Sequence, residues 1–144
     1  MLQSFPLVRL AALDLDGTLL NRNNEVTLAT RQAIARAVEH GVVVVPATGR
    51  PLASLPPVVA KLPGIRYAIT SNGAAVYHLP NRLCIHESAM EPALVCPIIE
   101  ELQKKSIHMD AFINGDGFSQ RSCEGKIDCL DMPTSIKRYI HRTR

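Results

Sequence analysis

The sequence predicts an α/β fold in which parallel strands alternate with helices. Two apolar stretches, residues 7–15 and 42–45, are typical of strands that are buried on both faces of a sheet. The segment between them, residues 27–40, carries apolar residues at helical spacing. A strand, a helix and a second strand in this order form a βαβ unit, which requires parallel strands and a right-handed crossover.

The first predicted strand, residues 7–15, leads into two acidic residues. Asp14 and Asp16 are two positions apart, so an extended backbone would point both side chains to the same face. Gly17 follows and allows the chain to leave the strand through a conformation that side chains disfavour. Because ligands of open α/β sheets bind at the carboxyl ends of the strands, this is where we expect a site.

Two carboxylates at this spacing repel each other unless a cation or a shared proton lies between them. Magnesium is the natural cation, because it prefers oxygen ligands and shares its shell with water and substrate phosphate. One carboxylate could then attack phosphorus while the other transfers a proton to the leaving oxygen. The alternative is a pair of solvated acids at the turn after a strand.

The predicted helix over residues 27–40 is bounded by recognisable cap residues. Thr27 is a suitable N-cap, and Gly41 stands where a left-handed C-terminal cap is favoured. Its expected apolar stripe consists of Leu28, Ile34, Ala37 and Val38. The β-branched run at 42–45 then predicts a second, fully buried strand.

The second strand ends in a connection that suits phosphate. Thr48 offers a hydroxyl, Gly49 an unobstructed backbone N–H and Arg50 a cation, all of which bind phosphate oxygens. A helix over residues 51–62 is expected next, broken at Pro56-Pro57. The alternative is an ordinary strand–turn–helix connection without a ligand.

A third strand is predicted at residues 67–70, followed by Asn72, which either contacts substrate or only adopts the left-handed turn that asparagine tolerates. Beyond it the pattern changes to a hairpin at 75–86, a helix at 92–105 and a second hairpin at 107–122 around an Asn-Gly step. This order favours a small α+β domain. We therefore expect half of a core at 1–73 and a partial second domain at 74–144.

Three short strings, D-x-D-G-T from Asp14, A-T-G-R up to Arg50 and N-G-A from Asn72, resemble motifs of the haloacid dehalogenase superfamily, in its Cof-type sugar and cofactor phosphatase branch. The resemblance covers about residues 7–122. It implies a Rossmann-like core with an inserted α+β cap, and an aspartyl-phosphate mechanism on small phosphorylated metabolites. Asp14 would be the nucleophile and Asp16 the general acid/base, with both holding Mg²⁺. The residues expected to bind phosphate or substrate are Leu15, Gly17, Thr48, Gly49, Arg50 and Asn72.

The family's later motifs, a lysine and a second acidic strand end, are not found in the sequence. With at most three core strands, the predicted sheet is incomplete. We therefore expect the chain alone to be inactive, and to self-associate or to depend on a missing C-terminal half. The alternatives are a non-catalytic fragment that binds a partner through its open sheet edge, and a receiver-like phosphoacceptor domain. The receiver reading is disfavoured because the third strand ends in Thr70 rather than in aspartate.

Composition argues against several other classes. The formal net charge is only +3, with a basic segment at 137–144, and the absence of tryptophan leaves no stacking platform for single-stranded nucleic acid. No apolar run approaches the roughly 20 residues that a membrane helix needs. The four cysteines have no zinc-site spacing, and no leader peptide is apparent. We expect a cytoplasmic protein without nucleic-acid or membrane partners.

Overall fold

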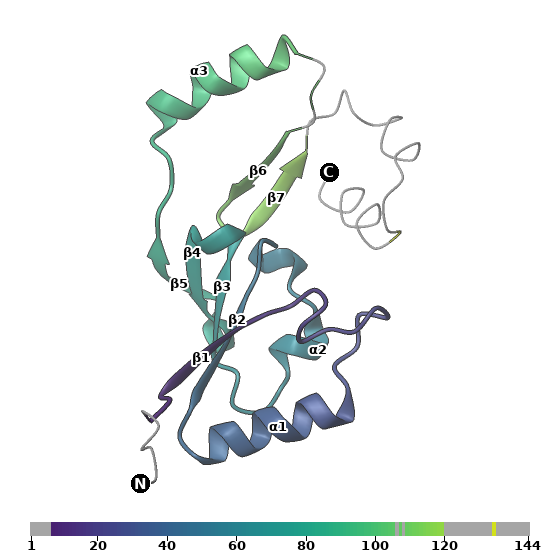
Figure 1. Cartoon of the computed structure of the whole chain (residues 1–144). Helices are drawn as coiled ribbons and strands as arrows, with labels where there is room; N and C mark the ends of the chain where they lie inside the picture. The colour runs from purple at the N-terminus through teal and green to yellow at the C-terminus, as the bar shows by residue number, and fades with distance from the viewer. Residues whose placement is uncertain (1–6, 106, 108, 120–133, 135–144) are drawn as a thin grey trace, which may run out of the picture.

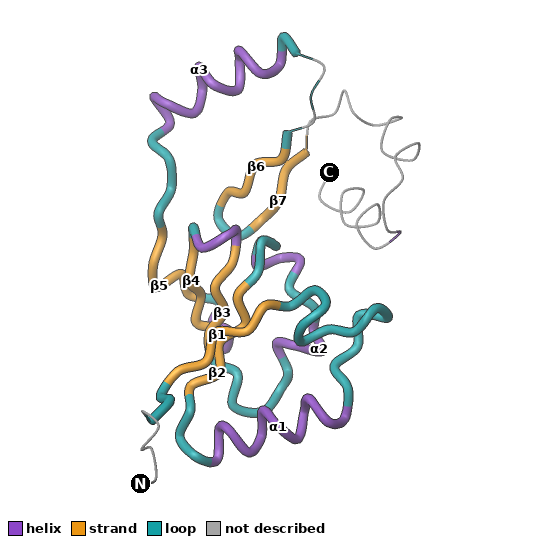
Figure 2. The backbone as a smooth tube through the Cα atoms, in the orientation of Figure 1, coloured by secondary structure: helices purple, strands orange, loops and turns teal. Residues whose placement is uncertain are grey.

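The computed structural model describes residues 7–105, 107, 109–119 and 134 of the 144-residue chain. Its five-stranded sheet has the order β1-β2-β3-β4-β5, and β6 and β7 form a separate hairpin (Figures 1 and 2). The elements are β1 (Leu10–Asp14), α1 (Leu28–Glu39), β2 (Val43–Ala47), α2 (Pro57–Ala60), β3 (Tyr67–Thr70), β4 (Ala75–His78), β5 (Leu83–Glu87), α3 (Pro92–Gln103), β6 (Asp110–Ile113) and β7 (Asp116–Ser119). Short 3-10 turns occur at Leu52–Ser54, Ser71–Gly73 and Leu79–Asn81.

The first three strands are parallel, which confirms the predicted α/β class. β1 pairs with β2 from Leu10 opposite Val43 to Asp14 opposite Ala47. β3 continues the sheet on the other side of β2, with Ile69 opposite Ala47. All three strands therefore end at the same edge of the sheet, where the sequence predicts the site.

Helix α1 begins and ends as its sequence predicts. The Thr27 hydroxyl accepts a hydrogen bond from the Thr30 backbone N–H at 3.2 Å, and Gly41 takes the left-handed conformation at φ +80°. Ile34 is buried, but Leu28 is 71% exposed, so its predicted place in the packed stripe is wrong. In the described part of the chain, nothing covers the first turn of the helix at that position.

The segment after β2 is shorter in helix than expected. A 3-10 turn at Leu52–Ser54 precedes α2, which covers only Pro57–Ala60. The predicted interruption at Pro56-Pro57 is confirmed, because Pro56 is extended and Pro57 starts α2. Leu52 and Leu55 before the break and Val59 after it are buried in the same hydrophobic cluster.

The hairpin formed by β4 and β5 extends the same sheet as the parallel strands. β4 runs antiparallel to β3, with Tyr67 opposite His78 and Thr70 opposite Ala75. Residues just beyond the predicted boundary at 73/74 are thus hydrogen-bonded to the core. The division of the chain into two domains at that point stays a prediction.

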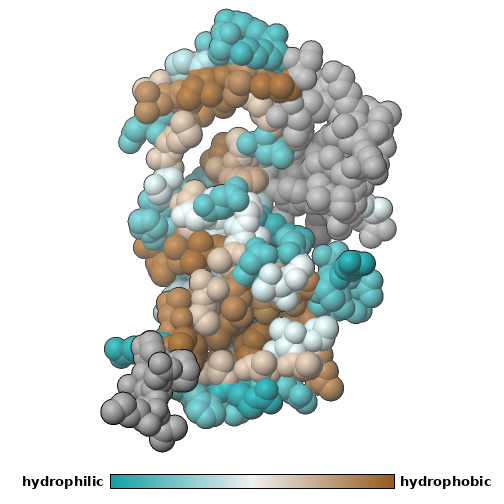
Figure 3. Space-filling view, viewed as in Figure 1, coloured by the Kyte–Doolittle hydropathy of each residue, from teal (hydrophilic) through white to brown (hydrophobic). Residues whose placement is uncertain are grey.

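Helix α3 and the β6–β7 hairpin lie at the opposite end of the described structure from α1 (Figure 1). The Asn114-Gly115 step joins the two strands, with both residues at positive φ, as the Asn-Gly signal predicts. No residue of α3 is buried, and Leu94 and Ile98 contribute to the apolar surface along it (Figure 3).

The hydrophobic core lies beneath the parallel strands rather than on both sides of β1. Val44, Val59 and Ala68 are buried to 2% exposure or less. By contrast, Leu10 is 58% exposed and Val43 44% exposed, so the prediction that these two strands are buried on both faces is wrong in the described structure. Leu10 and Val43 are paired across the two strands and so lie on the same face, and their exposure shows that no described element covers that face at this point.

Candidate active site

The end of β1 presents its two carboxylates to solvent on either side of a buried residue. Asp14 and Asp16 are exposed, whereas Leu15 between them is completely buried in the hydrophobic cluster. This alternation is that of an extended chain, as the spacing predicts. Because the Leu15 side chain points into the core, only its backbone is available to the substrate contact expected there.

The loop after Asp16 folds back on the end of β1. Gly17 has φ +84° and its N–H donates to the Leu20 carbonyl at 3.1 Å, while the Leu19 N–H donates to the Asp14 carbonyl at 3.1 Å. The Thr18 hydroxyl donates to Asp14 Oδ2 at 3.5 Å. Thr18 was not among the predicted site residues, although the threonine of the D-x-D-G-T string is the signal that marks it.

The end of β2 holds Thr48 in a defined position. Thr48 is 7% exposed, and its backbone N–H donates to the Ile69 carbonyl of β3 at 3.0 Å. The Arg50 N–H donates to Thr48 Oγ1 at 3.2 Å. Because that bond uses a lone pair of the hydroxyl, the hydroxyl proton remains available for an acceptor such as a phosphate oxygen.

The turn after β3 packs against this connection. The Ser71 N–H donates to the Arg50 carbonyl at 2.9 Å and the Asn72 N–H to the Thr48 carbonyl at 3.2 Å. A Cβ on Gly49 would lie 2.7 Å from Asn72 Oδ1, so only glycine fits there without a shift. Asn72 has φ 56°, which confirms the left-handed turn. A substrate contact by Asn72 stays a prediction.

One ion pair joins the end of β1 to the end of β2. Arg50 Nη2 lies 2.6 Å from Asp16 Oδ1, and Arg50 Nε donates to Asp16 Oδ2 at 3.1 Å. The guanidinium thus donates to both carboxylate oxygens in the bidentate geometry that arginine favours. Together with the Asn72 contact, this brings predicted site residues from three strand ends into one cluster.

The β6–β7 turn also contacts the segment that follows Arg50, which the sequence did not reveal. The Ala53 N–H donates to the Gly115 carbonyl at 2.9 Å. A Cβ on Gly115 would lie 3.0 Å from the Tyr77 hydroxyl and 3.2 Å from Leu52 Cβ. Burial, followed by the nearby groups of Cys84, Glu87 and Asp116, raises the pKa of Tyr77. The sequence did not reveal the contact at Gly115, because a close approach of backbone to side chains leaves no periodic pattern.

Two carboxylates are available for a metal ion at the strand end. Within the described ranges, no group of three or more His, Cys, Asp or Glu side chains could hold one. Magnesium commonly binds through one or two carboxylates, with water and substrate phosphate completing its octahedral shell. Asp14 and Asp16 therefore fit magnesium, with Asp14 the freer of the two because Arg50 occupies Asp16.

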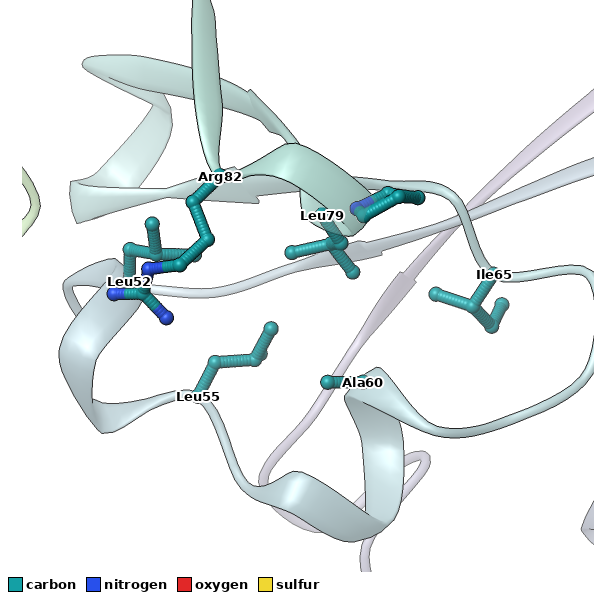
Figure 4. A pocket seen from close by; sticks show the side chains of 7 residues that line it. Leu52, Leu55, Ala60, Ile65, Leu79 and Arg82 are labelled. Carbon is teal, nitrogen blue, oxygen red and sulfur yellow. The ribbon is translucent and has the colours of Figure 1, made fainter.

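A cavity of about 170 Å³ opens elsewhere, between the segment from Leu52 to Ile65 and the 3-10 turn at Leu79–Asn81 (Figure 4). Its lining consists of Leu52, Leu55, Ala60, Ile65, Leu79, Pro80 and Arg82. No carboxylate or hydroxyl side chain lines it. We therefore place the chemistry at the strand ends rather than in this cavity.

Comparison with known proteins identifies the family of this chain. Residues 11–143 match the sequence profile of haloacid dehalogenase-like hydrolases. The chain belongs to this family. The superfamily and Cof-type branch predicted from the three strings are thereby confirmed. The expectation that the resemblance ends near residue 122 is wrong, because the family match continues almost to the last residue.

Several proteins similar to this chain are named as phosphatases. The chain is 30% identical over 105 residues to phosphatase YwpJ of Bacillus subtilis, covering 73% of the chain and 36% of that protein. It is 30% identical over 116 residues to the 5-amino-6-(5-phospho-D-ribitylamino)uracil phosphatase YwtE of the same organism, covering 81% and 40%. The chain thus spans about two fifths or less of these relatives' lengths.

Solved structures of the family share the fold. A haloacid dehalogenase-like hydrolase from B. subtilis superposes with a TM-score of 0.73 at 23% identity, covering 94% of this chain and 51% of the other. This confirms the Rossmann-like core.

In the described ranges, no helix is long and apolar enough to cross a membrane. The basic segment at 137–144 lies outside the described residues.

Proposed function

We propose that Asp14 and its neighbours form the nucleophile and phosphate-binding part of a magnesium-dependent phosphatase site for small phosphate monoesters. The observation that carries this proposal is the pairing of β1 with β2, which sets Asp14 opposite Ala47, the residue before Thr48. The ion pair between Asp16 and Arg50 adds a second link between the two strand ends. Membership of the haloacid dehalogenase-like hydrolases and similarity to a phosphatase support the same reaction.

The first step transfers the phosphoryl group to the protein. An oxygen of the Asp14 carboxylate attacks phosphorus, the bond from phosphorus to the ester oxygen breaks, and Asp16 gives its proton to that leaving oxygen. The Thr48 hydroxyl donates to a phosphoryl oxygen while negative charge develops there. When bound, magnesium supplies positive charge that offsets the repulsion between the phosphate and Asp14.

The second step releases phosphate. A water molecule attacks phosphorus of the aspartyl-phosphate and loses a proton to Asp16, and the bond to the Asp14 oxygen breaks. Asp16 is then protonated for the next cycle, and Asp14 is regenerated as a carboxylate. The two acids thus have separate tasks, which variants of each can distinguish.

The proposed substrate class is phosphorylated sugars or cofactor precursors. Relatives of the chain include HMP-PP phosphatases and two phosphatases of 5-amino-6-(5-phospho-D-ribitylamino)uracil. Their names describe small phosphorylated metabolites, and a site open at the strand ends is compatible with that class.

The test compares Asp14→Asn with Asp116→Asn, an equivalent change at an exposed position on β7. Hydrolysis of p-nitrophenyl phosphate with magnesium is measured for the chain alone and for the chain mixed with a fragment covering the rest of YwpJ. We expect turnover in the mixture, none with Asp14→Asn, and little change with Asp116→Asn. Turnover that survives in Asp14→Asn would contradict the nucleophile assignment.

A further inference from the structure

The ion pair between Arg50 and Asp16 occupies the group that the proposed mechanism needs for proton transfer. Arg50 Nη2 reaches Oδ1 at 2.6 Å and Nε reaches Oδ2 at 3.1 Å, so each carboxylate oxygen already accepts a donor. A carboxyl group held at both oxygens is not oriented toward an ester oxygen. The ion pair therefore competes with proton transfer by Asp16.

The pair is accessible enough to be broken by another anion. The side chains are 27% exposed for Arg50 and 55% exposed for Asp16. Ion pairs at such exposure are weak, because water and salt screen them. A phosphate dianion offers more charge and more acceptor oxygens to the same planar fork, so it is an effective competitor for the guanidinium.

The backbone of Arg50 lies beside Thr48, where phosphate is expected to bind. Its backbone N–H is bonded to Thr48 Oγ1 at 3.2 Å, and its carbonyl is held by the Ser71 N–H at 2.9 Å. The backbone of Arg50 is thus fixed from two sides, whereas its side chain is anchored by Asp16. A change of partner requires only a side-chain rotation.

We propose that Arg50 is a positioning residue that exchanges partners, pairing with Asp16 in the described arrangement and moving to the phosphate group when an ester binds. This inference rests on the proposed function. The exchange brings the guanidinium to the phosphate oxygens, and it frees the Asp16 carboxyl to face the leaving oxygen. Asp16 would therefore become available for proton transfer only when phosphate is present.

The direct test follows the Arg50 Nε–H by NMR in the 144-residue chain with magnesium, while inorganic phosphate is added. Arg31 is the internal control, because its Nε donates to the Val26 carbonyl at 3.1 Å, outside the cluster of predicted site residues. We expect the Arg50 signal to move together with the Thr48 and Gly49 amides, and the Arg31 signal to stay. Asp16→Asn should change the Arg50 signal in the free protein but not in the phosphate-bound one.

A double-mutant cycle gives the second readout. Phosphate binding is measured without magnesium, so that the loss of a metal ligand does not enter. Asp16→Asn removes the competitor, so phosphate should bind up to about fivefold more tightly, the factor that corresponds to an ion pair of 1 kcal/mol. In an Arg50→Lys background, which keeps the charge but lacks the fork, most of that gain should disappear. An equal gain in both backgrounds would show a through-space charge effect and would overturn the exchange.

The remaining outcomes separate the inference from the function. If the Thr48 and Gly49 amides shift while the Arg50 Nε–H stays on Asp16, the exchange is overturned. If ester hydrolysis still requires Asp14 in that case, the proposed function stands. Failure of phosphate to shift any of these signals overturns the exchange, and the hydrolysis assay then decides the function by itself.

Discussion

β1 and β3 flank the same strand, yet their surroundings differ sharply. β3 lies between β2 and β4, and its Ala68 and Thr70 are completely buried. β1 carries the proposed nucleophile but has β2 as its only partner in the described sheet, and Leu10 is 58% exposed. Of these two strands, the one that bears the proposed chemistry therefore has the less support, and its end is held by backbone hydrogen bonds from Leu19 to Asp14 and from Leu20 to Leu15.

The largest expected effect tests this difference with one substitution made at two places. We call β2, β3 and β4, each of which has a partner on both sides, the supported half of the sheet. Leu62 belongs to the hydrophobic cluster of this half and is 3% exposed, so Leu62→Ala should lower the free energy of unfolding by about 2–5 kcal/mol. Leu10→Ala should cost less than about 0.5 kcal/mol, as at other exposed positions. Urea unfolding monitored by circular dichroism measures both.

An equally large cost for Leu10→Ala would break the comparison. It would mean that the β1 edge is covered in solution, and sedimentation at several protein concentrations would show whether a second copy covers it. An exposed strand edge with unpaired backbone groups favours such pairing.

The supported side should also contribute to catalysis. Thr48 is nearly buried at the end of β2, so Thr48→Val keeps the shape of the side chain while removing the donor to phosphate. We expect a loss of about 2.7–4 kcal/mol in transition-state stabilisation, measured as kcat/KM in the reconstituted hydrolysis assay. Unchanged kinetics would make Thr48 a turn residue only.

How far the sequence alone could anticipate this molecule depended on the range of each signal. The Thr27 cap, the Asn114-Gly115 turn and the βαβ order are local or periodic, and the structure confirms them. The meeting of Asp16 with Arg50, 34 residues apart, followed only in outline from parallel strand ends. Its two-pronged geometry could not be predicted, because it depends on how the two connections pack.

Burial was the weakest part of the sequence interpretation. An apolar strand such as β1 has the same sequence whether it lies in the centre or at the edge of a sheet. The exposure of Leu10 therefore had no signal in the strand itself, and only the expected incompleteness of the sheet pointed to it. The contact of Gly115 with Leu52 and Tyr77 was equally invisible, since glycine is also common in turns that touch nothing. Strand order and hairpin docking are properties of the whole fold.

A moderate effect is expected from tightening the contact between the hairpin and the supported half. Gly115→Ala adds a Cβ near the Tyr77 hydroxyl and Leu52 Cβ, at φ +84°. Gly41→Ala is the matched control, because Gly41 has φ +80° with nothing within 4 Å of a Cβ. In both variants, the left-handed backbone should lower the free energy of unfolding by about 1–2 kcal/mol.

Gly115→Ala should cost about 1–3 kcal/mol more than the control, as overpacking usually does. Faster hydrogen exchange of the Ala53 amide, which donates to the Gly115 carbonyl, would locate the damage at this contact. Equal losses of unfolding free energy in the two variants would show that the hairpin shifts to accommodate the added Cβ. The hairpin contact would then contribute little to the stability of the supported half.

The smallest effect concerns Tyr77, which lies on β4 between the sheet and the hairpin turn. Burial, then Cys84, Glu87 and Asp116, raise its pKa above the ordinary value of 10.0, so the folded state favours the neutral phenol. The stability that this shift contributes is complete below pH 10 and is lost as pH rises through the raised pKa of the folded state. Tyr77→Phe should flatten the fall of unfolding free energy at alkaline pH, whereas Tyr67→Phe on β3 should keep it. An identical slope in wild type and Tyr77→Phe would mean that water reaches the phenol, and that the supported half of the sheet is looser than its burial indicates.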